Sequence, residues 1–182
     1  MPAASAVPAT SAPSFAAPPF AAPTPFARIR RLLNLINLST PAGLALARAA
    51  KCRITRGPDG LLLAGGWNWP LPRAAAFTVG NVILYRSRAA SSFRPAHRGP
   101  LASGLRTVGP SPSRLLRHES RHSTQYAALG PAFLPLYFLA AGISRLRTGD
   151  PASGNVFERL AGLDDGGYRR PAPRSQAPIP GH

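Results

Sequence analysis

Proline is unevenly distributed along this 182-residue chain, and its distribution limits where a compact domain can form. Residues 1–26 contain seven Pro and nine Ala and no charged side chain, so they cannot form a periodic apolar face. Residues 86–113 consist mainly of Arg, Ser, Pro and Gly, and residues 169–182 are similarly polar and rich in proline. We therefore expect one domain at 27–168, with disordered tails at 1–26 and 169–182 and a basic loop inserted at 86–113.

The charge balance of the chain is strongly basic. It has 22 Lys and Arg residues against 6 Asp and Glu residues, a formal net charge of +16, which attracts anionic lipid and nucleic acid. The basic segment 86–113 contains one aromatic residue, Phe93, and no recognisable reading helix or finger, so we do not expect nucleic acid to be a partner. The single cysteine, Cys52, excludes an internal disulfide and a cysteine-based zinc site.

Local patterns in the expected domain predict helices followed by short strands. Apolar residues recur at helical spacing in 26–38, and residues 42–50 are rich in helix formers after a Thr-Pro start signal. Residues 52–55 and 61–64 flank a Pro-Asp-Gly turn and predict a β-hairpin, while residues 77–85 predict a strand with a bend at Gly-Asn. We therefore expect an α+β fold with a small antiparallel sheet of about three strands packed with helices.

Two apolar segments could be covered either by the domain or by a membrane. The helix at 26–38 carries Arg opposite its apolar residues, and we expect its apolar face to pack on the domain, although such helices also lie on membranes. Residues 133–143 are nearly all apolar and are followed by Arg145 and Arg147, as at a membrane interface. Because prolines interrupt this run, we favour a buried helix beneath the motif described next, with membrane association through 131–144 as the alternative.

Residues 118–122 read His-Glu-Ser-Arg-His, the one motif in the chain that indicates specific chemistry. On a helix, positions i and i+4 share a face, so the imidazoles of His118 and His122 can reach one ion. Zinc makes water acidic enough to supply hydroxide near neutral pH, and Glu119 lies close enough to take the proton. The chain contains only two glutamates, Glu119 and Glu158. The motif therefore predicts a zinc site with Glu119 as the general base.

With this motif the chain resembles the HExxH metallopeptidases of the glutamate-zincin kind, in which a Glu on a later helix is the third zinc ligand. The run 155–161 is similar to the Glu-x-x-Ala motif of that second helix. Residues 122–135, with a Gln and a Gly-Pro, also resemble small uncharacterised bacterial proteins, and the shared order of features covers roughly 35–168. The resemblance implies a zinc ion held by His118, His122 and Glu158, with Glu119 as the general base.

Further residues are expected to complete such a site. Zinc-binding histidines normally donate their other ring nitrogen to a carboxylate or carbonyl, and among the nearby acidic residues we expect Asp164 to take this role. A tyrosine hydroxyl commonly polarises the substrate carbonyl in zincins, and the sequence does not choose among three candidates. These are Tyr126, Tyr137 and Tyr168.

The motif and the resemblance together predict a zinc-dependent, metallopeptidase-like hydrolase that acts on a peptide or protein substrate. The alternative is a non-catalytic basic protein, associated with membrane or nucleic acid, in which the HExxH sequence is structural or accidental. Residues 1–26 lack the basic start and unbroken apolar core of a secretory signal. We therefore expect a cytoplasmic or membrane-associated protein.

Overall fold

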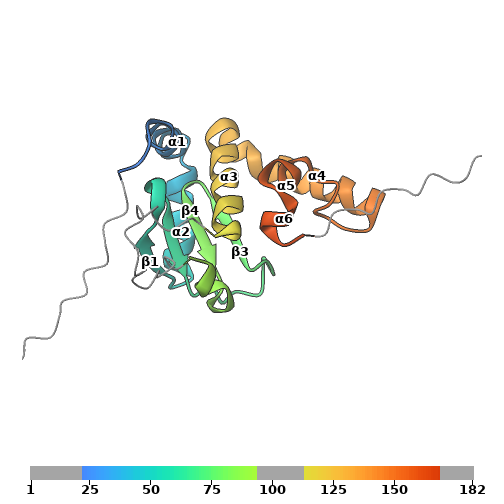
Figure 1. The fold of residues 1–182 in the computed structure, drawn as a ribbon, viewed down its shortest axis with the longest axis horizontal. Coiled ribbons are helices and arrows are strands. Elements are labelled where there is room, and N and C mark those ends of the chain that lie inside the picture. Colours follow the sequence, from blue (N-terminus) through green and yellow to red (C-terminus); the bar gives the residue numbers. More distant parts are fainter. Residues whose placement is uncertain (1–21, 94–112, 169–182) are drawn as a thin grey trace, which may run out of the picture.

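The computed structural model describes residues 22–93 and 113–168, which form an α+β fold, as predicted from the sequence (Figure 1). Two helices precede four short strands, and the remaining helices follow the strands in the chain. The helices are α1 (Pro25–Ile36), α2 (Ser39–Ala49), α3 (Arg114–Leu129), α4 (Phe133–Thr148), α5 (Val156–Ala161) and α6 (Leu163–Gly166).

The sheet has four strands in the order β1-β2-β4-β3 and is mixed rather than wholly antiparallel. The predicted hairpin is confirmed as the antiparallel pair β1 and β2. The predicted single strand at 77–85 is instead a second hairpin, because Gly80 adopts φ +62° and turns the chain between β3 and β4. This hairpin places β4 parallel to β2 and leaves β3 at the edge. The strands are β1 (Arg53–Arg56), β2 (Leu62–Gly65), β3 (Ala76–Val79) and β4 (Val82–Tyr85).

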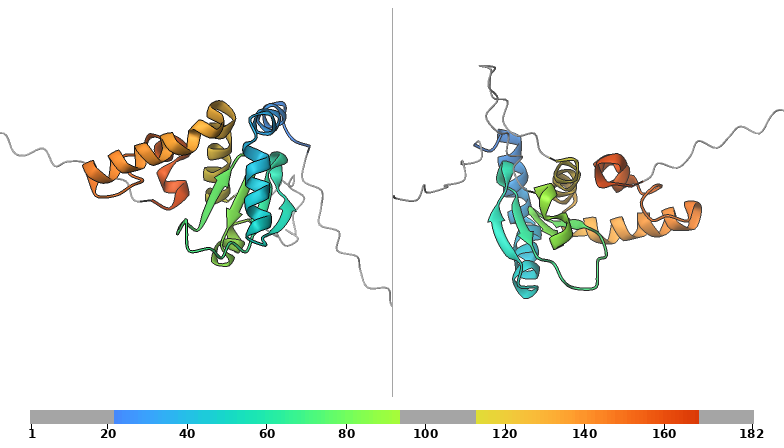
Figure 2. Two further views of the ribbon diagram at one scale, coloured as in Figure 1. Left: turned by 180° about the vertical axis from the view of Figure 1, so that it is seen from behind. Right: turned by 60° about the horizontal axis from the view of Figure 1, so that its bottom comes forward.

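Helices cover both faces of the sheet, which is why the central strand β4 has an apolar run rather than an alternating pattern. On one face α2 contributes Ala47 to a cluster with Val82 and Leu84. On the other face Ile83 packs with Leu116 of α3. Burial of both faces favours continuous apolar residues in a strand. Helix α3 is thereby fixed against the sheet, next to the edge strand β3 (Figure 2).

The domain boundaries differ from the predicted ones at two places. Helix α1 begins at Pro25, inside the predicted N-terminal tail. The predicted basic loop begins with the 3-10 helix η2 (Ser87–Phe93), and the Phe93 ring stacks on Tyr85 with centroids 4.4 Å apart. This start of the insert therefore belongs to the core, because its aromatic side chain is buried there. The rest of the predicted loop up to residue 112, and the predicted tails at 1–21 and 169–182, lie outside the described residues.

Helix α1 is turned the opposite way from the sequence-based expectation. Its buried positions include two polar residues, Arg30 and Asn34, and its large apolar side chains are exposed. Arg30 donates to Ser120 Oγ over 3.0 Å, and the Asn34 amide donates to the Ser123 carbonyl over 2.9 Å. Hydrogen bonds to α3 thus hold the polar side of α1 inward. The prediction that the apolar face packs on the domain is wrong.

Helix α4 is not the buried core helix that the sequence favoured. Only Phe133 and Ser144 are buried in it, and the helix projects away from the sheet (Figure 2). Among the described residues, the continuous helical stretch Arg114–Thr148 is the one long and apolar enough to cross a membrane by length and composition, and 17% of its apolar window is buried. Length and composition alone are weak evidence, because core helices meet the same criteria; the low burial separates this stretch from a core helix.

Candidate metal centre

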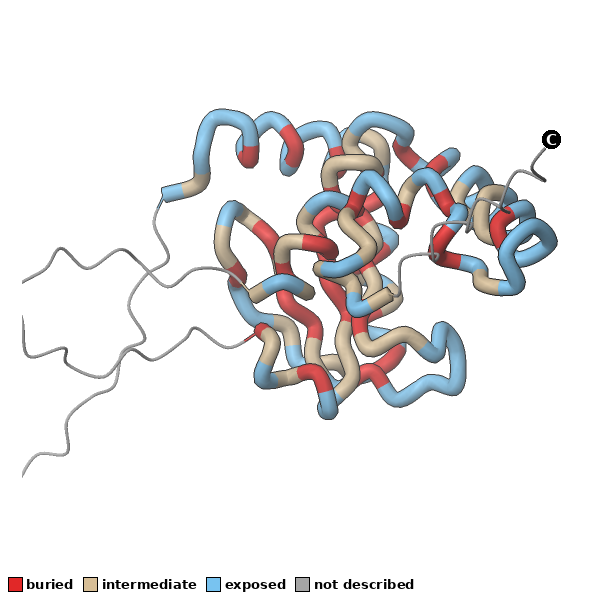
Figure 3. The backbone as a smooth tube through the Cα atoms, turned by 45° about the vertical axis from the view of Figure 1, so that its right-hand side comes forward, coloured by how far each residue is buried: buried red, intermediate tan, exposed pale blue. Residues whose placement is uncertain are grey.

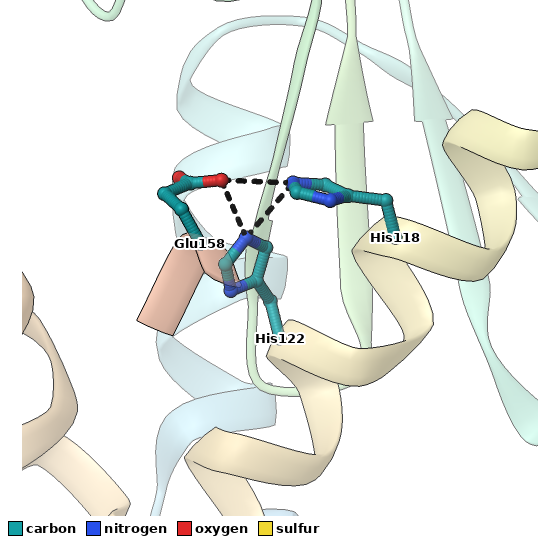
Figure 4. Close-up of side chains that lie close together, drawn as sticks. All are labelled: His118, His122 and Glu158. Carbon is teal, nitrogen blue, oxygen red and sulfur yellow. Dashed lines mark hydrogen bonds and ion pairs between the residues drawn. The ribbon is translucent and has the colours of Figure 1, made fainter. Parts of the chain in front are cut away.

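Helix α3 places the two histidines of the motif on one buried face. The helix begins cleanly because the Ser113 hydroxyl accepts a hydrogen bond from the Leu116 backbone N–H over 3.1 Å. One helical turn separates His118 from His122, and their Nε2 atoms lie 3.1 Å apart (Figure 4). Both side chains are buried. The predicted pairing of these two imidazoles is therefore present.

Glu158 reaches the same point from α5, after the chain has reversed direction at the end of α4. In the reversing loop, Ser144 Oγ accepts a hydrogen bond from the Gly154 N–H over 2.8 Å. Asn155 then caps α5, its side-chain oxygen accepting from the Phe157 N–H over 3.0 Å. Glu158 Oε2 lies 3.2 Å from His118 Nε2 and 3.7 Å from His122 Nε2. The three predicted ligands thus converge on one point (Figure 4).

The other ring nitrogen of each histidine is held by a partner that fixes its proton. His118 Nδ1 lies 3.1 Å from the Gly162 carbonyl, which can only accept, so Nδ1 is the donor. Gln125 Nε2 donates to the Phe157 carbonyl over 3.0 Å, which turns Gln125 Oε1 toward His122 Nδ1 at 2.8 Å. Both Nε2 atoms are consequently left with lone pairs directed at Glu158.

These two partners correct the role predicted for Asp164. The nitrogens that Asp164 was expected to hold are bound by the Gly162 carbonyl and by the Gln125 amide. The sequence resemblance includes Gln125 without implying a role for it. Its position three residues after His122 on the same helical face is the signal that could have found it. The Gly162 carbonyl carries no such signal, because any residue type supplies a carbonyl.

Two arginines of α3 secure the segment that contains Gly162. Arg121 donates to the Ala161 carbonyl over 2.7 Å and to Asp165 over 2.9 Å. Arg117 donates to Asp165 over 3.2 Å, and these hydrogen bonds hold the pKa of that carboxyl below its usual range. Arg121, inside the motif, therefore holds the Ala161 carbonyl, next to the Gly162 carbonyl that binds His118.

Three atoms with lone pairs meet at the centre, so a positive charge is needed between them. Burial alone would lower the pKa of His118, but the hydrogen bond to Glu158 and the charges of both glutamates outweigh it, so the pKa is raised. Burial likewise works against ionisation of Glu158, yet the two histidines hold the pKa of this carboxyl at about 2. A proton on His118 can supply the charge. The same buried group of His118, His122 and Glu158 could instead hold a metal ion.

Glu119 is buried next to this group and has its own partner on the edge strand. The Thr78 hydroxyl donates to Glu119 Oε2 over 2.6 Å. Burial raises the pKa of Glu119, although the neighbouring histidines and the Thr78 hydrogen bond act in the opposite direction. This glutamate is therefore not one of the three converging groups. It is a second carboxylate, more easily protonated than an exposed one.

The centre opens into an apolar cleft of about 530 Å³. His118, His122, Glu119 and Glu158 all line it. Its walls come from the edge strand β3, the loop after β2, helix α2, the start of α4 and the segment after α6. Their apolar and aromatic side chains include Trp67, Trp69, Leu71, Phe77, Leu134, Phe138 and Tyr168.

The three candidate tyrosines occupy different places in this cleft. The Tyr126 hydroxyl is buried without a hydrogen-bond partner among the described residues. Tyr137 donates to Glu158 Oε1, and burial together with the Glu158 charge raises the pKa of this phenol. Tyr168 lies beside His118, with ring centroids 5.9 Å apart, and no described residue bonds its hydroxyl. Of these two hydroxyls without a described partner, that of Tyr168 belongs to the less buried side chain and to the one beside His118.

Comparisons of the chain with family models, with curated proteins and with solved structures found no match. The functional argument therefore rests on the geometry of this centre and on the cleft around it.

Proposed function

We propose that the protein is a zinc-dependent, peptidase-like hydrolase of the kind that the HExxH motif suggests. The observation that carries the proposal is the spacing of the three ligand atoms, at 3.1, 3.2 and 3.7 Å. Zinc binds nitrogen and oxygen ligands at about 2.0–2.1 Å in a tetrahedron, which places neighbouring ligand atoms about 3.3 Å apart. Two imidazoles with fixed tautomers and one carboxylate are also a ligand set found in catalytic zinc sites.

Glu119 is suited to move a proton during the reaction. When bound, zinc supplies Lewis acidity, which activates water near neutral pH and polarises a carbonyl. Thr78 occupies Glu119 Oε2, so Glu119 takes the proton of the attacking water at Oε1 and then donates it to the leaving amine. The raised pKa of Glu119 supports the first step, because a carboxylate that binds a proton more tightly is a stronger base.

The cleft supports a polypeptide as the substrate class. Strand β3 lies at the edge of the sheet and lines the cleft with residues 76–79, and an edge strand can pair with an extended peptide. The aromatic walls favour apolar side chains near the scissile bond. In this arrangement the Tyr168 hydroxyl donates to the oxygen of the substrate carbonyl.

Zinc stoichiometry tests the proposed zinc site. We expect about one zinc per purified chain by elemental analysis, lost in His122→Ala and in Glu158→Gln. The matched control is Leu160→Gln, an exposed position on the same helix as Glu158, which should keep its zinc. A folded wild-type protein that holds no zinc after incubation with zinc salts and desalting overturns the proposal.

Substitutions of the only two glutamates of the chain test the proposed hydrolysis and the role of each glutamate in it. The substrate probe is a library of internally quenched peptides with apolar residues flanking the scissile bond. Glu119→Gln should keep zinc and lower cleavage by about 10²–10⁴-fold, because it removes the proton acceptor. Glu158→Gln should lose zinc and cleavage together. Cleavage by Glu119→Gln at the wild-type rate contradicts the assigned role.

A further inference from the structure

Helix α1 presents to solvent the side that an amphipathic helix normally buries. Arg30 is 4% exposed and Asn34 is fully buried, whereas Phe26 is 61% and Ile36 is 67% exposed. The buried polar groups bond to α3, so the outward direction of the apolar side is fixed. The exposed apolar residues in or directly after α1 are Phe26, Ile29, Leu32, Leu33, Leu35, Ile36 and Leu38.

Helix α4 is apolar over most of its circumference. At about 100° per residue, its exposed apolar side chains cover an arc of about 200°, from Leu134 round to Leu136. The opposite side, with Phe133, Tyr137 and Ser144, is the one less exposed to solvent. Figure 3 shows the long exposed stretches of this helix. The exposed apolar residues are Leu134, Leu136, Phe138, Leu139, Ile143 and Leu146.

The end of α1 and the start of α4 lie at the same end of α3. The Asn37 side chain, directly after α1, donates to the Tyr126 carbonyl over 2.9 Å near the end of α3. A Cβ on Gly130, just before α4, would lie 3.4 Å from the Asn37 side chain. Among the residues that the structure describes, thirteen of the eighteen large apolar residues that are exposed belong to these two helical segments. We call these thirteen residues the α1–α4 surface.

From these observations we propose that the α1–α4 surface docks on the face of an anionic lipid membrane. The exposed arginines Arg28 and Arg31 on α1 and Arg145 and Arg147 on α4 lie beside the apolar residues, where they can meet lipid phosphates. Helix α4 has 16 residues and is therefore about 24 Å long, less than the hydrocarbon thickness of about 30 Å. It lies in the membrane interface rather than across the bilayer.

The width of the apolar arc on α4 favours lipid over a second copy of the chain. A helix that packs on one protein partner buries a stripe of roughly 100°. An arc of about 200° is wider than one such stripe, whereas fluid acyl chains can cover it entirely. The arginines at the edges act in the same direction, because they would repel their counterparts in a copy that carries a net charge of +16.

Docking in this way would bring the cleft to the membrane. Leu134 and Phe138 belong both to the α1–α4 surface and to the wall of the cleft. The cleft would then open at the lipid interface, and its substrate would be a polypeptide held in or on the membrane. This consequence rests on the proposed function, whereas the docking itself does not.

Vesicle flotation of the full chain tests the docking directly. The probes are vesicles of phosphatidylcholine alone and of phosphatidylcholine mixed with phosphatidylglycerol. We expect the protein to float with both, and more with the anionic mixture. Leu32→Glu and Leu139→Glu should each weaken binding at least about tenfold, because each removes an apolar side chain that docking would bury in the membrane. Leu160→Glu, on α5 and 68% exposed, is the matched control and should bind like wild type.

Two double charge-reversal variants distinguish docking by this surface from attraction by the net charge of the chain. Arg28→Glu with Arg31→Glu should weaken binding to anionic vesicles more than about tenfold. Lys51→Glu with Arg53→Glu, in the turn after α2 and at the start of β1, changes the net charge equally and should have little effect. Far-ultraviolet circular dichroism verifies that each variant is folded. His122→Ala should still float, so failure of the proposed function is seen separately.

Three results would overturn the proposal. The first is that the wild type floats with neither kind of vesicle. The second is that the control variants lose binding as much as the surface variants. The third is that the protein sediments as a dimer that Leu32→Glu or Leu139→Glu dissociates, since a second copy would then cover the surface.

Discussion

At the scale of single residues, Gln125 links the two helices that supply the ligands. Its amide contacts His122 on α3 and the Phe157 carbonyl on α5, next to Glu158. Gln125→Ala removes both bonds and should weaken zinc binding by about 10–100-fold, the usual cost of losing a partner of a ligand histidine. Competition with a chromophoric chelator measures the affinity.

Two further variants make this prediction specific. Gln125→Glu keeps an acceptor for His122 but cannot donate to Phe157, so its affinity should fall between those of the wild type and Gln125→Ala. Thr124→Ala, the neighbouring position on the same helix, is the control and should bind zinc normally. Equal affinities for the wild type and Gln125→Ala would show that the amide does not hold the imidazole.

The raised pKa of His118 predicts opposite pH dependences with and without metal. In the metal-free protein this pKa is above the ordinary value of 6.5, so its stabilising effect is complete below pH 6.5 and is lost as the pH rises through the folded-state pKa. With zinc, the proton competes with the ion, so stability should rise over the same window. Thermal unfolding in EDTA and in excess zinc measures both slopes, and slopes of the same sign would contradict the prediction.

At the scale of elements, the sequence predicted those helices and strands that form through interactions between residues close together in the chain. The hairpin of β1 and β2 follows from its Pro-Asp-Gly turn, and α1 and α3 follow from helical periodicity. The parallel pairing of β4 with β2 depends on how the connection 66–75 returns to the sheet, which is not local. Periodicity also cannot tell which side of a helix faces inward, and in α1 the hydrogen bonds of Arg30 and Asn34 decide it.

The short helix α6 should be sensitive to a single methyl group. A Cβ on Gly166 would lie 2.6 Å from His118 Cε1, so Gly166→Ala should displace this imidazole and weaken zinc binding by about 10–100-fold. Gly142→Ala on α4 is the control, because a Cβ there meets nothing within 4 Å. That variant should bind zinc normally and be more stable by up to about 1 kcal/mol. Chelator competition measures the zinc affinity of the two variants, and thermal unfolding measures their stability. Equal zinc affinities would contradict the placement of Gly166 against a zinc ligand.

At the scale of the whole molecule, the candidate metal centre lies between two parts of the chain. Two ligands belong to α3, which packs on the sheet, and the third belongs to α5, which follows the projecting helix α4 (Figure 1). Metal binding should therefore stabilise residues 149–168 more than the sheet. At free zinc a thousandfold above its dissociation constant, the folded state gains about 4 kcal/mol.

Hydrogen exchange with and without EDTA measures this difference. In EDTA the amides of α5 and α6 should lose protection first, because these short helices are held to α3 mainly by side-chain hydrogen bonds, from Gln125, Arg117, His118 and Arg121. Strands β2 and β4 should change little, since their pairing and core contacts do not involve the centre. Glu158→Gln in excess zinc should reproduce the EDTA pattern. Equal loss of protection in the sheet and in α5 would instead mean that the domain unfolds as one unit, with the metal stabilising all of it equally.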